Sequence, residues 1–229
     1  IRLATPLINS CSLCGLCKEV CPADIDMSFI NRESRRIMWE KEYMPPALHY
    51  FPIRDMRFAN SEEFFLAKNQ KETKKSKYLF FPGCQLSASL PKAIKKTYLH
   101  LCGYLQGGVG LMLGCCGAPS VWAGRQELSQ EAWDKILKEW KKMGEPRIIV
   151  ACPSCYKVFK ENMPNFKISF LAEVLNKLPV PEVDRDELVR AYSFHDPCTT
   201  RYEKKLQDSA RELSLILGCD LKELPYNRD

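Results

Sequence analysis

The chain has 229 residues, 45% of them hydrophobic, and its 34 lysines and arginines outnumber its 28 acidic residues to give a net charge of +6. This length allows one medium-sized domain with a small additional module. The longest apolar runs have the length of strands, far short of the ~20 residues of a membrane span, so no transmembrane segment is expected. The basic stretch at 68–77 has no interleaved aromatic residues, so nucleic-acid binding is not expected either.

Twelve cysteines are far more than a chain of this size ordinarily carries. Such usage is typical of disulfide scaffolds in oxidising compartments and of metalloproteins in reducing ones. The chain is long and apolar enough to fold without disulfides, and its cysteines fall into metal-ligand spacings. Both features favour a cytoplasmic metalloprotein. Because residue 1 is Ile rather than Met, we expect the chain to be a piece of a longer protein.

The first predicted element is a metal-binding loop with the sequence C-S-L-C-G-L-C-K-E-V-C-P. Its spacing, C-x2-C-x2-C-x3-C-P, is the bacterial signature of a cubane iron–sulfur cluster. The two-residue gaps let the thiolates curl around one cluster face while backbone N–H groups point at the sulfurs. The sequence therefore predicts a cubane 4Fe-4S cluster on Cys11, Cys14 and Cys17, with Cys21 as a ligand to this cluster or to a neighbouring one. A zinc knuckle and buried thiols are the alternatives.

Strands and helices are expected to alternate from residue 78 onward, after a cysteine-rich helical start and a basic linker. Alternation of this kind predicts an α/β fold with a mainly parallel sheet. The expected strands lie at 78–81, 109–113, 148–151, 168–171 and 192–195, and helices are expected at 91–101, 128–143 and 209–217, the first of them closed by Gly103. Two cysteines at predicted helix ends, Cys102 and Cys219, are expected to be buried thiols, and Trp122, Trp133 and Trp140 are expected in the core.

Five more cysteines follow the first three of these strands: Cys84, Cys115, Cys116, Cys152 and Cys155. In an open parallel sheet, ligands bind beyond the carboxyl ends of the strands, so three loops are expected to bring five thiolates together. The C-P-S-C element opens a predicted helix, whose N-terminal dipole favours thiolates. A tetrahedral zinc site needs only four ligands, whereas a polynuclear iron–sulfur cluster can use five. Zinc with one spectator thiol stays as the alternative at this second site.

The pattern C-x30-CC-x35-C-x2-C, with F-P-G-C before it and C-C-G within it, resembles the cysteine-rich CCG domain. That family includes heterodisulfide reductase and the iron–sulfur subunits of anaerobic glycerol-3-phosphate dehydrogenase and glycolate oxidase. The resemblance implies a non-cubane 4Fe-4S cluster on the five cysteines. H-D-P-C at 195–198 resembles the opening of a second CCG motif, which makes Cys198 a further candidate ligand, although no second C-C-G follows it in this chain.

The expected organisation is thus a small helical ferredoxin-like 4Fe-4S module at 1–60, a basic linker at 61–77, a Rossmann-like α/β CCG domain at 78–185, and the start of a second, incomplete CCG domain at 186–229. The second start rests on the likeness of Y-L-F-F-P-G-C at 78–84 to Y-S-F-H-D-P-C at 192–198. No catalytic residue is assigned.

The resemblance also implies the function of an electron-transfer oxidoreductase subunit in a heterodisulfide-reductase-like complex. Electrons would pass from the cubane cluster to the five-cysteine cluster and on to a disulfide, quinone or flavin. The implied partners are a flavoprotein or other redox subunits, with a cytoplasmic location or one peripheral to the membrane through a partner. One alternative is a catalytic disulfide reductase that binds a disulfide or thiol substrate, and another is a zinc-stapled structural or interaction subunit.

Overall fold

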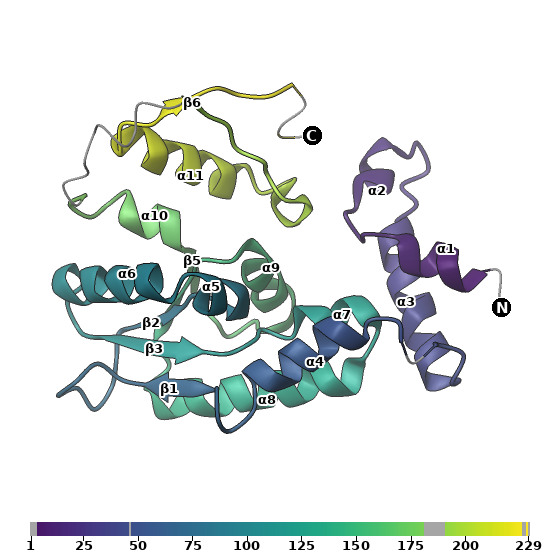
Figure 1. Cartoon of the computed structure of the whole chain (residues 1–229), viewed down its shortest axis with the longest axis horizontal. Helices are drawn as coiled ribbons and strands as arrows, with labels where there is room; N and C mark the ends of the chain where they lie inside the picture. The colour runs from purple at the N-terminus through teal and green to yellow at the C-terminus, as the bar shows by residue number, and fades with distance from the viewer. Residues whose placement is uncertain (1–3, 46, 181–190, 226–227, 229) are drawn as a thin grey trace.

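A computed structural model describes residues 4–45, 47–180, 191–225 and 228 of the chain. Its centre is a five-stranded sheet flanked by helices (Figure 1), which confirms the expected α/β class. The strand order is β1-β3-β2-β4-β5; β1 runs antiparallel to β3 and the other pairs are parallel. The strands are β1 (Leu66–Lys68), β2 (Tyr78–Phe81), β3 (Val109–Leu113), β4 (Arg147–Val150) and β5 (Ile168–Phe170).

The central strand β2 is buried on both faces, as its continuous apolar sequence predicts. Leu79 and Phe81 point into one layer of the core and Phe80 into the other, because successive side chains of a strand face opposite sides. The first layer is closed by α8 (Gln126–Lys142) and α9 (Pro153–Asn162), and the second by α6 (Pro91–Tyr104) and α10 (Leu171–Leu175). Short helices α5 (Cys84–Ser89) and α7 (Ala118–Ala123) follow β2 and β3.

Several local expectations were wrong. Gly103 does not end α6, which continues to Tyr104, because a single glycine inside a helix costs only about 1 kcal/mol. Residues 66–68, inside the expected linker, form β1 because they find an unpaired edge on β3. Trp122 is 39% exposed rather than in the core, whereas Trp140 is buried. The thiols of Cys102 and Cys219 are half-buried rather than buried.

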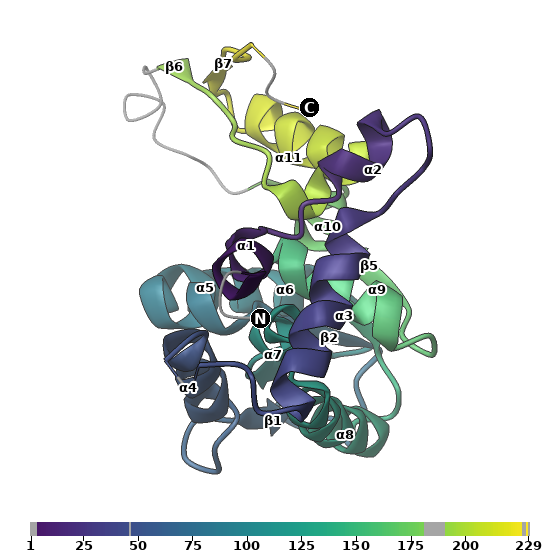
Figure 2. The ribbon, with the colours of Figure 1, turned by 90° about the vertical axis from the view of Figure 1, so that its right-hand side faces the viewer.

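The N-terminal module consists of helices α1 (Ala4–Ser10), α2 (Leu16–Val20), α3 (Met27–Glu40) and α4 (Tyr50–Ala59). Asp26 caps α3, since its side chain accepts a hydrogen bond from the Phe29 N–H at 3.0 Å. Helices α3 and α4 both contact α7 (Figure 2). Gly124, which ends α7 with a φ of +72°, lies directly against the α3 backbone. The module is therefore joined to the sheet domain through α7.

The C-terminal part forms a separate small unit with strands β6 (Ala191–Tyr192) and β7 (Asp220–Leu221), the short 3-10 helix η2 (Cys198–Thr200) and helix α11 (Lys204–Ile216). Strands β6 and β7 pair in parallel. The strand expected at 192–195 is reduced to its first residue, α11 begins earlier than expected, and β7 was not foreseen. Helix α11 packs against α10, where the Asn176 Nδ2 donates to the Ser209 carbonyl at 3.0 Å.

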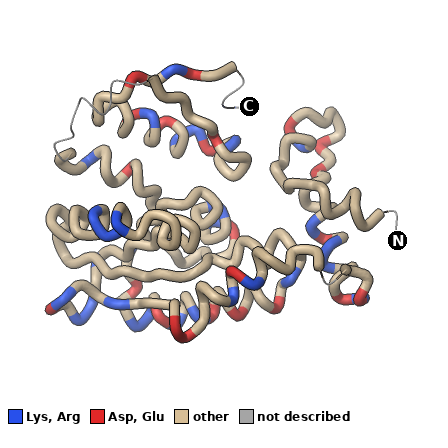
Figure 3. The backbone as a smooth tube through the Cα atoms, viewed as in Figure 1, with Lys and Arg blue, Asp and Glu red and all other residues tan. Residues whose placement is uncertain are grey.

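Charge is distributed unevenly over the ribbon. Lysines gather on the loop between β1 and β2 and on α6, at the end of the molecule opposite the α1–α3 module (Figure 3). The basic stretch at 68–77 lies in that loop. Among the helices that the structure describes, none combines the length and hydropathy of a transmembrane span.

Candidate metal centres

Three loops at the carboxyl edge of the sheet carry five cysteines. Cys84 opens α5 after β2, Cys115 and Cys116 lie between β3 and α7, and the pair Cys152 and Cys155 lies at the start of α9 after β4. Strands β3, β2 and β4 are neighbours in the sheet. The parallel direction of these strands therefore delivers all five thiols to the same edge.

The five thiols form one contiguous group. Side-chain hydrogen bonds link Cys84 to Cys115, Cys115 to Cys116, Cys116 to Cys155 and Cys155 to Cys152. Three of them, Cys115, Cys116 and Cys155, are at most 3% exposed. All twelve cysteines of the chain are free thiols. Among the described residues, no group of three or more His, Cys, Asp or Glu side chains forms a ready-made site for a metal ion; the thiols hydrogen-bond to one another instead.

These contacts divide the thiols into two protonation classes. Hydrogen bonds from the Cys115 and Cys155 thiols lower the pKa of Cys116 to about 5, and the Cys155 thiol lowers the pKa of Cys152 to about 6. Donation to a neighbouring sulfur, together with burial, raises the pKa of Cys84, Cys115 and Cys155. Because the thiolate is the ligating form of cysteine, metal binding here would release the protons of the second class.

Backbone N–H groups point at the sulfurs of both cysteine sets. The donor usually belongs to the residue two positions further along the chain. Such bonds favour the thiolate and are among the factors that set the potential of an iron–sulfur cluster. The pairs are Cys11 with Leu13, Cys14 with Leu16, Cys115 with Gly117, Cys116 with Ala118 and Cys152 with Ser154.

Gly83 leaves room beside the second set. It has a φ of +89°, and a Cβ placed on it would lie 3.1 Å from both the Cys152 Cβ and the Cys155 Sγ. That separation is tighter than ordinary van der Waals contact, so a side chain here would crowd the sulfurs. The absence of a side chain at this position, together with five convergent soft donors, fits a polynuclear thiolate-bound cluster.

Two residues that sequence reasoning missed hold the C-C-G peptides in place. The Asn60 side chain accepts from the Cys115 N–H at 2.8 Å and donates to the Cys115 carbonyl at 3.1 Å. The Trp133 Nε1 donates to the Cys116 carbonyl at 3.1 Å. Asn60 lies at the end of α4, so the N-terminal module reaches the second cysteine set directly.

The first cysteine set lies around α2. Cys11 and Cys14 precede the helix, Cys17 lies in it and Cys21 caps its C-terminus, and all four are half-buried. The remaining candidate, Cys198, is exposed at the start of η2 and makes no described hydrogen bond with the five-cysteine group. The structure thus keeps the two sets separate.

A buried cation stands next to the first set. Arg35 of α3 is 2% exposed, and its guanidinium donates to the carbonyls of Ile8, Cys11 and Trp122, the last at 2.7 Å. Within the described part of the chain no carboxylate lies at ion-pair distance from it. Burial lowers the pKa of Arg35, and the Cys11 thiolate opposes this effect. A buried cation needs a negative partner, and a thiolate-ligated cluster supplies one, so the first set also fits such a group.

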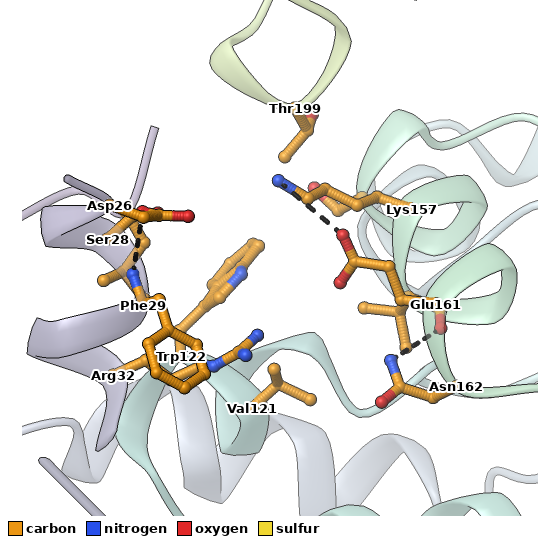
Figure 4. A pocket seen from close by; sticks show the side chains of 13 residues that line it. Asp26, Ser28, Phe29, Arg32, Val121, Trp122, Lys157, Glu161, Asn162 and Thr199 are labelled. Atoms are coloured by element: carbon orange, nitrogen blue, oxygen red, sulfur yellow. Dashed lines mark hydrogen bonds and ion pairs between the residues drawn. The ribbon is translucent and has the colours of Figure 1, made fainter. Parts of the chain in front are cut away.

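A cavity of about 380 Å³ lies between the two cysteine sets (Figure 4). Leu13 from the first cysteine loop and Ser154 from the C-P-S-C element both line it, and Trp122 stands between them. Thr199 of η2 closes it from above. On one wall, Lys157 lies 4.0 Å from Glu161 in an exposed ion pair. The lining contains no cysteine.

Comparison with known proteins supports the CCG resemblance. The family model of the cysteine-rich CCG domain matches residues 78–160, which hold the five cysteines of the second set. These residues are therefore a CCG domain. No solved structure matches the chain significantly.

Curated relatives are named as iron–sulfur or redox proteins. An uncharacterised iron–sulfur protein of Methanococcus maripaludis is 24% identical, covering 90% of this chain and 44% of the relative. A subunit of the dihydromethanophenazine:CoB–CoM heterodisulfide reductase of Methanosarcina mazei is 21% identical (95% and 59%), and a subunit of the CoM/CoB fumarate reductase of Methanothermobacter marburgensis is 22% identical (82% and 40%). The chain spans about half the length of these relatives.

Proposed function

Starting from a CCG domain at residues 78–160, we propose that this chain is an iron–sulfur electron-transfer subunit of a heterodisulfide-reductase-like redox complex. The first cysteine set would hold a cubane 4Fe-4S cluster and the second a non-cubane one. When bound, the clusters supply one-electron redox chemistry. The chain supplies thiolate ligands, N–H bonds to sulfur and burial, which tune that chemistry.

One observation carries the proposal: five thiols from three sheet loops form a single hydrogen-bonded group at the carboxyl edge. A structural zinc site would use four of them and leave the fifth without a role. The names of the relatives add support, since the heterodisulfide reductase and fumarate reductase relatives are both subunits of redox enzymes.

The burial of Cys115, Cys116 and Cys155 favours a relay function over direct attack on a substrate disulfide. The cavity between the two cysteine sets exposes no sulfur to a small molecule. The partners are then other redox units, a flavoprotein among them. We assign the helical module to 1–60, the CCG domain to 78–185 and the beginning of a second such domain to 186–229.

Metal analysis and EPR of the anaerobically purified protein test the proposal. We expect about eight irons per chain for two 4Fe-4S clusters. In Cys116→Ala, the EPR signal of the second site should disappear while that of the first site stays. Cys102→Ala is the matched control, because this thiol lies on α6 outside both sets, and it should retain both signals. One equivalent of zinc at the second site, with iron only at the first, would contradict the non-cubane assignment.

A further inference from the structure

The C-terminal unit contacts the first cysteine set through Arg201. Its Nη1 donates to the Cys14 sulfur at 3.7 Å, across 187 residues of sequence. Next to it, the Tyr202 ring lies 4.0 Å from the position that a Cβ on Gly15 would occupy. Two consecutive residues of the C-terminal unit therefore pack on the first cysteine loop.

The segment that presents Arg201 is fixed from below. The Gln207 Nε2, on buried α11, donates to the Thr200 carbonyl at 3.0 Å and to the Arg201 carbonyl at 3.5 Å. Thr200 itself is buried, and its N–H donates to the Pro197 carbonyl at 2.8 Å. In Figure 4, Thr199 of the same segment faces the cavity between the two cysteine sets. Arg201 is thus held over Cys14 by backbone contacts rather than resting on a free loop.

The charge of Arg201 is not neutralised by an acidic neighbour. Within the described ranges no carboxylate lies at ion-pair distance from its guanidinium. A cation that donates to a ligand sulfur stabilises the more negative, reduced state of an iron–sulfur cluster, and hydrogen bonds to sulfur are among the factors that set cluster potentials. Partial burial at this contact limits solvent screening of the effect.

Resting on the proposed function, we propose that Arg201 is a positioning residue of the first cluster, which raises its reduction potential through a hydrogen bond and a positive charge at the Cys14 sulfur. The C-terminal unit then contributes to the first site as well as to its own. The presence of that unit on the α2 loop sets the driving force for electrons that enter or leave there.

An EPR-monitored redox titration of the complete, anaerobically purified protein tests this. The signal of the first cluster is identified as the one lost in Cys14→Ala. In Arg201→Met we expect a lower midpoint potential, by about tenfold in the reduction equilibrium, which corresponds to about 59 mV for a one-electron couple. Arg201→Lys keeps the charge and should show a smaller shift. Arg147→Met removes the same charge at the opposite, amino end of β4 and should leave the potential unchanged.

A potential in Arg201→Met equal to that of the unsubstituted protein would overturn the inference, as would an equal shift in Arg147→Met. Iron content and the second-site signal are measured in parallel. If Arg201→Met fails to retain the first cluster, Arg201→Gln, which keeps an N–H donor without the charge, carries the measurement. An unsubstituted protein without any cluster signal at the first site would instead overturn the proposed function on which the inference rests.

Discussion

The side chain of Asn60 holds the peptide of Cys115 from both sides, with Oδ1 2.8 Å from the Cys115 nitrogen and Nδ2 3.1 Å from its carbonyl oxygen. This is the contact by which the N-terminal module fixes the orientation of the adjacent cysteines. The Lys135 Nζ in turn donates to the Asn60 carbonyl at 2.7 Å, so α8 anchors the same corner.

Replacing Asn60 by Ala should weaken the second site more than the first. The substitution leaves the N–H and the carbonyl of Cys115 without their partners, and each unsatisfied buried group costs about 1–3 kcal/mol. We expect iron loss during a chelator challenge to accelerate at the second site, measured by the decay of its EPR signal. Asn69→Ala is the control, since Asn69 also makes two side-chain hydrogen bonds, to Lys74 and Ser76, but in the β1–β2 loop. Equal loss in both variants would argue against a local role for Asn60.

Arg35 should be indispensable to the first site. Arg35→Met removes the buried cation and leaves the carbonyls of Ile8, Cys11 and Trp122 without a donor. We expect a stability loss of about 3–5 kcal/mol, by analogy with a broken buried charge contact, and loss of the first EPR signal. Arg35→Lys keeps the charge but not the planar fork that reaches three carbonyls, so partial retention is expected.

An unaltered first-site signal in Arg35→Met would mean that the cation only joins α3 to α7. Thermal unfolding then separates the two roles, because a purely structural contact lowers the unfolding temperature without changing the spectrum of the bound cluster.

Much of the sheet and the convergence of three loops were predictable because they depend on local patterns. The runs Tyr78–Phe81 and Val109–Leu113 are apolar segments between turn residues, and both strands have the expected bounds. Cysteines placed just after such strands must meet at one edge when the strands are parallel. The assignment of metal ligands and of domain boundaries remains a prediction.

The supporting residues were not predictable, because their partners are remote in sequence. Arg35 meets Trp122 across 87 residues and Arg201 meets Cys14 across 187. Neither arginine has a local pattern that distinguishes it from a solvated surface charge. The short strand β1 was missed for a similar reason, since Leu66–Lys68 is a strand only because β3 offers it an edge.

Gly124 is expected to control how the N-terminal module docks. A Cβ on this residue would lie 2.4 Å from the Arg36 nitrogen, and its φ of +72° is unfavourable for any L-residue with a side chain. Gly124→Ala should therefore lower the unfolding temperature and loosen α3 from α7. In Gly103→Ala the new methyl group meets no atom within 4 Å, and a helical Gly-to-Ala change stabilises by about 0.5–1 kcal/mol. The two alanine variants should shift the unfolding temperature in opposite directions; shifts of the same sign would refute the close-approach argument.

The last prediction concerns the C-terminal unit, whose interior is held by an ion pair between Arg211 and Asp196. Their side chains are 7% and 8% exposed, and the Nη2–Oδ2 distance is 2.6 Å. Arg211 also pairs with Glu223 near β7, which raises the pKa of the arginine. Asp196 belongs to the H-D-P-C sequence, so the pair fixes the chain two residues before Cys198.

Arg211→Met leaves the Asp196 carboxylate buried without its cation, and a broken buried pair costs about 3–5 kcal/mol. We expect proteolytic cleavage within 191–225 to accelerate at least tenfold, since about 1.4 kcal/mol already changes an opening equilibrium by that factor. The double variant Arg211→Met with Asp196→Leu removes both charges and should recover part of the loss, because no charge is then buried alone. Limited proteolysis followed by mass spectrometry of the fragments measures both. Additive losses in the double variant would show that the two side chains do not stabilise the unit as a pair, and the rigid support proposed for Arg201 would then have to come from Gln207 alone.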